Sequence, residues 1–412
     1  MSGADPARLA RRAWALAGLW LLVIYLTIPL ARAIQRWVDA HLGRPAFTYA
    51  VFAALAVGVL LALRHRRRAT GSWHRGSLWC LGAVALAYGV GTWQLRSNPE
   101  EAMHFVQYGV LSLLLFLALS ATRRDGAVYL AAFLMGTLAG VMDEVVQWIT
   151  PRRFFDFRDI GINVMAVGLM QLALAFGLRP AGSVEAFAPG TLRMVRRLAV
   201  TLCLLLTSMV AATPVRLAAL PAWLGLARID EPLIEYGHRI EEPGLGIFYS
   251  RLTPALLRES DLARAEQAGP LVAAQATDEH YAAFLVEHPA TRDPFLYELR
   301  VRLFRRDRYA RDAWNTRRNP EAHARFQTVA WQEQQILERY FGATLRQAGL
   351  DWSPEQRERA RAAAGPLEKP SPVGQHLVTR ISEPWLLPLP AAGLLVFLLM
   401  LHYAARPARA TK

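Results

Sequence analysis

Residues 100–122 read EEAMHFVQYGVLSLLLFLALSAT, an apolar run that begins with two glutamates, a histidine and a tyrosine. From Met103 onward the run is long enough to cross a bilayer, which takes roughly 17 to 25 mostly apolar residues as helix. Polar side chains at membrane depth are costly, and they usually face partners in a bundle or a wet cavity. The stretch therefore predicts a transmembrane helix with a polar end.

Seven other apolar runs bounded by charge occur along the chain. The eight predicted spans lie at about 13–33, 46–63, 76–95, 103–122, 127–149, 159–178, 197–213 and 385–404. This pattern predicts an all-α, polytopic helical membrane protein of about eight spans, with membrane lipids as its surroundings.

Residues 214–383 differ from the rest, because they are charged, rich in arginine and without a run of spanning length. Asn319 followed by Pro320 predicts the start of a helix reaching about Leu350, and Ser353-Pro354 predicts another. We expect a mostly helical domain with a looser start around 235–246. The nine arginines between 292 and 318 favour a solvated, ion-paired helix face, with contact to anionic lipid or wall polymers as the alternative.

The chain has 412 residues and a net charge of +14, which in a soluble protein would suggest nucleic acid. Here most arginines flank predicted spans, so no nucleic-acid partner is expected. Basic residues are retained on the cytoplasmic side during insertion, and the connections after the second, fourth and sixth spans are basic. The positions of most basic connections therefore predict that both termini are cytoplasmic. They also predict that residues 214–383 face outward from a bacterial cytoplasmic membrane.

Three consecutive spans carry polar side chains at the end that this orientation places outside. The pairs are His104 with Tyr108, Asp143 with Gln147, and Asp159 with Asn163; Glu144 follows Asp143. A four-residue step puts both members of a pair on one helix face, so the three faces can converge on one outward-opening pocket. The loop between the last two spans adds Arg152, Arg153 and Arg158, whose guanidinium groups suit phosphate or carboxylate.

These motifs occur in a fixed order: His104-Phe-x-x-Tyr108, Asp143-Glu144-x-x-Gln147, Pro151-x-Arg153 and Asp159-x-x-x-Asn163. The series resembles the VanZ-like family. Members often carry a lysine where this chain has Glu101 and a histidine where it has Val146. The resemblance implies a cell-envelope membrane protein, since the namesake is linked to resistance to the glycopeptide teicoplanin.

The predicted division of the chain follows from the spans and the resemblance. It comprises spans one to three (1–100), a VanZ-like core (101–180), a cytoplasmic linker with the seventh span (181–213), the extracytoplasmic domain (214–383), and the last span with a cytoplasmic tail (384–412).

The polar set allows several functions. His104 with Asp143, Glu144 and Asp159 could act in general acid–base catalysis as an outer-leaflet hydrolase or transferase. Tyr108, Gln147, Arg152, Arg153 and Asn163 are then candidate binding residues for an anionic lipid-linked or glycopeptide-like ligand. A structural network between helices, or a scaffold that recruits a partner through the outer domain, would also fit. No ligand spacing such as HExxH is present, and neither a metal nor a cofactor is expected.

Overall fold

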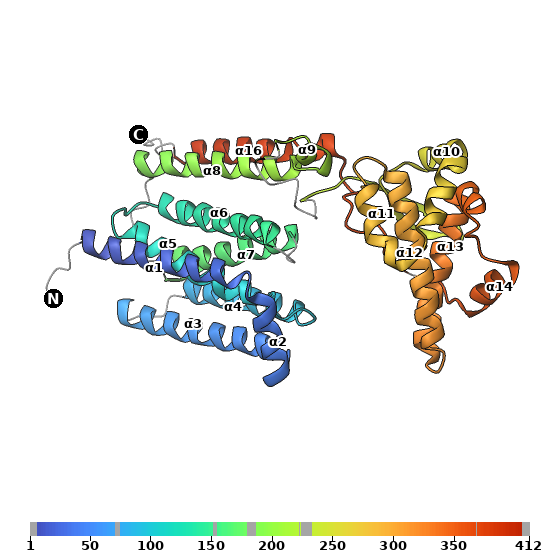
Figure 1. The fold of residues 1–412 in the computed structure, drawn as a ribbon. Helices are drawn as coiled ribbons and strands as arrows, with labels where there is room; N and C mark the ends of the chain where they lie inside the picture. The colour runs from blue at the N-terminus through green and yellow to red at the C-terminus, as the bar shows by residue number, and fades with distance from the viewer. Residues whose placement is uncertain are drawn as a thin grey trace. The chain divides into compact units, whose positions relative to one another are not determined.

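The computed structural model of the chain is almost entirely helical (Figure 1). It describes residues 6–70, 75–150, 155–178, 187–221, 223, 233–367 and 369–405. Two compact units are present, one formed mainly by 1–208 and 389–412 and the other by 209–228 and 232–388.

The first unit is a bundle of long helices. It contains α1 (Pro6–Thr27), α2 (Ala31–His41), α3 (Ala46–Thr70), α4 (Arg75–Gln94), α5 (Met103–Ser120), α6 (Ala127–Ile149), α7 (Phe157–Leu172), the π-helical turn η1 (Ala173–Leu178), α8 (Pro189–Ala211) and α16 (Leu389–Ala404). Seven described helices are long and apolar enough to cross a membrane, namely those of 7–27, 46–69, 103–120, 127–149, 157–178, 189–211 and 383–404. The predicted all-α, polytopic membrane fold is confirmed.

Two predicted spans differ in detail from the helices observed. The first was expected to reach residue 33, but α1 ends at Thr27, before Pro29, and α2 is a separate short helix without a buried residue. Proline lacks an N–H group and disfavours helix in the residue before it, which accounts for the break. The third predicted span is α4, a helix of 20 residues that is not among these seven.

Helix α5 is the centre of this bundle, since it packs against α1, α3, α6 and α7. Helices α6 and α7 meet closely because glycines face the contact. A Cβ atom on Gly136 would lie 2.8 Å from Val167 Cγ1, and one on Gly140 would lie 2.7 Å from Asn163 Cβ. The small-xxx-small pair thus packs helices together, as its spacing predicts.

The second unit packs α10 (Pro254–Ala274) and α12 (Pro294–Asn315) against α13 (Pro320–Ala348). Its other elements are α9 (Pro214–Ala218), the strands β1 (His238–Glu242) and β2 (Gly246–Ser250), the 3₁₀ turn η4 (Asp278–His280), α11 (Tyr281–Glu287), α14 (Pro354–Ala363) and α15 (Glu383–Leu386). The start that was expected to be loose is therefore in part an antiparallel hairpin, in which Ile240 is opposite Phe248. Gly244 has a φ of 84°, a turn conformation that glycine adopts at little cost.

The predicted helix starts of this unit are confirmed by their caps. The Asn319 side chain accepts a hydrogen bond from Ala322 N, and Ser353 forms a capping box with Gln356. Helix α13 ends at Gly349, whose φ of 65° is left-handed.

The arginine-rich helix α12 is not simply a solvated face. Arg300, Arg302 and Arg306 are buried, so the sequence-based interpretation is wrong for these three of the nine arginines. The Arg302 guanidinium donates to Glu333 Oε2 at 2.9 Å and to Tyr249 O at 2.7 Å. These arginines belong to the interior of the unit.

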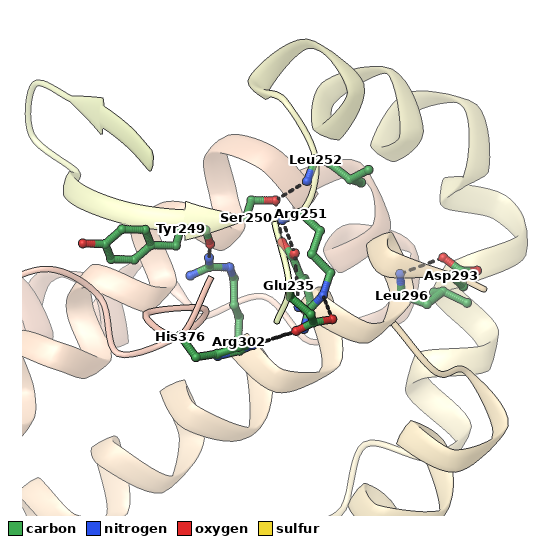
Figure 2. A network of polar contacts seen from close by, with 10 residues as sticks. Glu235, Tyr249, Ser250, Arg251, Leu252, Asp293, Leu296, Arg302 and His376 are labelled. Atoms are coloured by element: carbon green, nitrogen blue, oxygen red, sulfur yellow. Dashed lines mark hydrogen bonds and ion pairs between the residues drawn. The ribbon is translucent and has the colours of Figure 1, made fainter. Parts of the chain in front are cut away.

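A second polar network holds the end of β2 (Figure 2). Arg251 Nη2 donates to Glu235 Oε2 at 2.7 Å, and His376 Nε2 lies 2.8 Å from the same oxygen. Glu298 accepts from Arg251 N and from the Ser250 hydroxyl, each at 2.6 Å. The network joins three stretches that are far apart in the chain.

The charge of Glu235 should make the second unit sensitive to acid. Burial raises the pKa of this carboxyl, but the hydrogen bond from His376 and the charge of Arg251 outweigh it, and the net pKa is lowered. A lowered pKa contributes stability above the ordinary glutamate value of about 4.3, and that stability is lost as the pH falls through the folded-state value. In thermal unfolding of the full chain in detergent at pH 7, the melting temperature of the second unit should be higher in wild type than in Glu235→Gln. This difference in melting temperature should disappear below about pH 4. A gap that does not change with pH would contradict this role.

Candidate functional site

The first turns of α5 bring His104 and Tyr108 onto one face, as their spacing predicts. Their rings stack with centroids 6.1 Å apart and planes 11° from parallel. The Tyr108 side chain has no exposed surface, whereas the His104 side chain keeps 14% of its own. His104 is therefore the more accessible end of the pair.

The end of α6 supplies two buried carboxylates joined by an amide. Gln147 Nε2 donates to Glu144 Oε1 at 2.8 Å and lies 3.3 Å from Asp143 Oδ2. Glu144 Oε2 also accepts from the backbone N–H of Asp156 at 3.0 Å. The glutamate thus connects α6 to the segment that begins α7.

The start of α7 is fixed by Asp156, whose side chain accepts from Arg158 N at 2.7 Å as an N-cap. Asp159, in the first turn, places Oδ2 3.9 Å from His104 Nε2. One turn further, Asn163 Nδ2 donates to Gly140 O at 3.3 Å. The third predicted pair therefore contacts both α5 and α6.

Helices α5 and α7 run in the same direction and in constant register. His104 contacts Asp159, and eight residues further along each helix the Ser112 hydroxyl donates to Val167 O at 3.1 Å. Tyr108 is four residues after His104 on α5, and Asn163 is four residues after Asp159 on α7. The constant register therefore puts Tyr108 and Asn163 at the same level. These contacts bring residues of the three polar faces close to one another.

The cluster formed by His104, Tyr108, Asp143, Glu144, Gln147, Asp159 and Asn163 is mostly buried. Only the His104 and Asp159 side chains keep appreciable exposure, 14% and 16%. Solvent therefore reaches the cluster at the contact between these two residues. Arg152 and Arg153 lie outside the described residues.

Arg158 is found at the rim, paired with Glu101. Arg44 Nη2, on the connection before α3, donates to Glu100 Oε1 at 2.9 Å, and Gln35 of α2 donates to the same oxygen at 2.7 Å. Both arginines are about half exposed. Exposed ion pairs contribute only about 0–1 kcal/mol, so these arginines can exchange partners at little cost.

Sequence reasoning missed the residues that come from distant parts of the chain. Tyr25 of α1 donates its hydroxyl to Ala139 O at 2.9 Å and lies within electrostatic range of Asp143. Gln35 and Arg44 reach Glu100 from the chain between α1 and α3. The signal for Tyr25 was a hydroxyl in an otherwise apolar run, which by itself indicates no partner.

Two buried polar atoms of the cluster, His104 Nδ1 and Asn163 Oδ1, have no hydrogen-bond partner among the described residues. Most buried polar groups in folded proteins are hydrogen-bonded, and exceptions call for an explanation such as a ligand, an ion or water. No group of three or more His, Cys, Asp and Glu in the described ranges could hold a metal ion. The atoms are suited to a polar ligand that both donates and accepts hydrogen bonds.

The helices and this cluster define a multi-pass membrane protein with a polar site at one end of its central helices. Residues 20–176 match the family model described as VanZ/LLP1. This match supports a VanZ-like region over these residues, in agreement with the resemblance that the order of the motifs predicts. The match begins in α1 and so includes helices beyond those that carry the motifs. No curated protein and no solved structure matches the chain.

Proposed function

We propose that the VanZ-like domain binds the polar headgroup of a lipid-linked, phosphate-bearing envelope molecule at the outer leaflet, and that this binding underlies envelope maintenance or glycopeptide resistance. The observation that carries the proposal is the pair of buried atoms without a partner, His104 Nδ1 and Asn163 Oδ1, in the cluster that contains the His104–Asp159 contact. A cluster that only held helices together would have little reason to leave them unsatisfied.

The two arginines at the rim could contact an anionic headgroup. Arg44 and Arg158 hold Glu100 and Glu101 in exposed pairs, and a phosphate, like a carboxylate, can make bidentate contact with a guanidinium group. The headgroup would enter beside His104, which can donate a hydrogen bond to phosphate when protonated.

The orientation belongs to the same proposal. Because the basic connections favour the cytoplasmic side, we place both termini there, and the cluster with residues 214–383 on the outside of a bacterial cytoplasmic membrane. The division into membrane parts and an outer helical domain, as expected from the sequence, follows from this placement.

Substitution of His104 should separate a site from a structural network. We expect His104→Ala to retain normal protein abundance and to weaken binding of a fluorescent polyprenyl phosphate in vesicles about tenfold, the effect of losing roughly 1.4 kcal/mol of contact. For Asp143→Asn and Glu144→Gln the informative measurement is protein abundance, because these carboxylates hold Gln147 and repel an anionic headgroup. Cells that carry His104→Ala should show altered teicoplanin sensitivity.

Gln107→Ala is a matched control, because Gln107 lies on the same turns of α5 and its side chain makes no hydrogen bond to the described residues. It should behave as wild type. Lost abundance in the cluster variants would favour a structural network, and unchanged abundance with unchanged binding would overturn the proposal.

A second function, an outer-leaflet hydrolase or transferase, is favoured by one specific contact. His104 Nε2 and Asp159 Oδ2 are 3.9 Å apart, a pair that could orient an imidazole for general acid–base catalysis. The enzyme would release phosphate from a lipid-linked pyrophosphate in vesicles, and Asp159→Asn would abolish the release while leaving binding intact. Binding without any release in wild type would exclude this second function.

A further inference from the structure

One end of the second unit must lie at the membrane surface. The unit includes the last residues of the span 189–211 and the first residues of the span 383–404. A helix that crosses the bilayer ends near the headgroup layer, because its apolar length matches the thickness of the hydrocarbon core. The parts of the unit that contact these two span ends therefore lie at the level of the lipid headgroups.

Three segments of the chain meet at this end of the unit. The Arg216 guanidinium, just after the first span end, pairs with Glu383 at the second. Tyr236 Oη donates to Val210 O at 3.1 Å, which holds the segment before β1 at the same level. A backbone bridge from Tyr236 to Val378 joins this segment to the chain that leads into α15. The membrane end of the unit is formed by residues 209–218, 236–239 and 378–386.

A polar pocket of about 330 Å³ lies in this membrane end. Its lining provides the imidazole of His238, the guanidinium of Arg239 and the hydroxyls of Thr379 and Ser382. Ser382 precedes α15, yet its side chain makes no capping hydrogen bond. These groups are donors of the kind that phosphate oxygens accept from.

Basic side chains outnumber acidic ones at the membrane end. Glu383, the acid in the pocket lining, is paired with Arg216. Arg239 pairs with Glu241 at 2.8 Å, but 43% and 62% of these side chains are exposed, so the pair is weak and can exchange partners. Arg380 lies between two lining residues, is exposed, and forms no ion pair with the described residues. An anionic group in the pocket therefore meets an excess of positive charge.

Apolar side chains beside the pocket are exposed as well. Val215, Ile381 and Trp385 have 63%, 41% and 74% of their surface exposed. Tryptophan is enriched at membrane–water interfaces, where its ring lies at the level of the headgroups. Exposed apolar groups beside basic groups are typical of surfaces that contact anionic lipid. A small water-soluble anion would leave these apolar side chains uncovered.

We infer that this pocket binds the headgroup of an anionic phospholipid, such as phosphatidylglycerol, and so fixes the second unit to the bilayer surface. The site is separate from the His104 cluster and does not depend on the function proposed for that cluster. The lipid phosphate would accept hydrogen bonds from Arg239 and Ser382, and the acyl chains would cover Ile381 and Trp385. A zwitterionic lipid would gain less, because its own cation offsets the attraction between its phosphate and the arginines.

Two arginines provide a matched test. Arg239 lines the pocket, and Arg308 of α12 does not. Both are exposed and pair with an acid, Arg239 with Glu241 at 2.8 Å and Arg308 with Asp312 at 3.9 Å. Replacing either by glutamine breaks only an exposed pair, so neither variant should unfold the unit. Ser382→Ala is an independent probe of the pocket, since the lost hydroxyl makes no capping bond.

The full chain is placed in phosphatidylcholine nanodiscs with a small fraction of phosphatidylglycerol that carries a photoactivatable group near its headgroup, and the labelled peptides are identified by mass spectrometry. We expect labels on residues 236–239 and 378–383 in wild type and in Arg308→Gln. Arg239→Gln should reduce this labelling about tenfold, a change equivalent to about 1.4 kcal/mol. Ser382→Ala should reduce it about threefold, as expected for one neutral hydrogen bond. Phosphatidylcholine with the same photoactivatable group should label these peptides weakly in all four proteins.

Equal labelling of wild type and Arg239→Gln, or phosphatidylcholine labelling as strong as phosphatidylglycerol labelling, would overturn the inference. An excess of water-soluble glycerol phosphate distinguishes a lipid from a free phosphate ester. It should leave the labelling unchanged, because it has no acyl chains to cover Ile381 and Trp385. Loss of the label on adding glycerol phosphate would show that the pocket takes a soluble phosphate ester, and the assignment to a lipid would then be wrong.

Discussion

Glu333→Gln should lower the free energy of unfolding of the second unit by about 3–5 kcal/mol, the usual cost of removing one partner from a buried ion pair. Neither Glu333 nor Arg302 has any exposed side-chain surface. Glu333 accepts from Arg302 at 2.9 Å and from the Ser371 hydroxyl at 2.5 Å. Without the carboxylate charge, the buried guanidinium keeps only neutral partners, Tyr249 O and Ser371 Oγ.

The measurement is pulse proteolysis of the full chain in detergent over a urea series, scored by the loss of fragments from residues 232–388. Glu338→Gln on the same helix is the control, because Glu338 pairs with Arg357 at 2.8 Å where both side chains are about one-third exposed. Glu338→Gln should lower the free energy of unfolding by no more than about 1 kcal/mol.

The double variant Arg302→Met, Glu333→Leu should recover most of the stability lost in Glu333→Gln, because an apolar replacement removes both buried charges. A small effect of Glu333→Gln, similar to the control, would show that this pair does not hold the unit together.

The membrane part of the fold was predictable because lipid allows few solutions. A run of about twenty apolar residues can cross a bilayer only as a helix, since every backbone polar group must be satisfied within the segment. That rule places α5, α6 and α7 to within a few residues, whereas α3 continues to Thr70, past its predicted end at about 63. It gives no account of α2, whose mixture of charged and apolar residues forms a helix too polar to span.

The interior of the second unit was less predictable for a different reason. Charge alone suggests exposure, and Arg302 looks like the arginines around it in the sequence. Its burial depends on Glu333, 31 residues away, and on Ser371, 69 residues away. Such pairs arise from tertiary packing and leave no local pattern. The same limit explains why Arg44 and Tyr25 were not associated with the polar cluster, whereas the local i, i+4 pairs were.

Gly140→Leu should separate α6 from α7 at the polar cluster. An added Cβ would lie 2.7 Å from Asn163 Cβ, too close for two carbon atoms, and the contact is with the start of a side chain on a packed helix. Overpacking of this kind costs about 1–3 kcal/mol, and it would also break the hydrogen bond from Asn163 Nδ2 to Gly140 O. We expect a lower melting temperature in detergent and less monodisperse protein.

The position of Gly140 makes its effect on binding informative. Asn163 Oδ1 is one of the buried atoms assigned to the headgroup, so a shift of α7 that moves Asn163 should weaken polyprenyl phosphate binding. Gly161→Leu, on α7 itself, is the matched control, because an added Cβ there meets no atom within 4 Å. It should leave both stability and binding near wild type. If Gly140→Leu lowers stability but binds normally, the α6–α7 contact supports the bundle without positioning the site, and headgroup binding must then depend on the α5–α7 register alone.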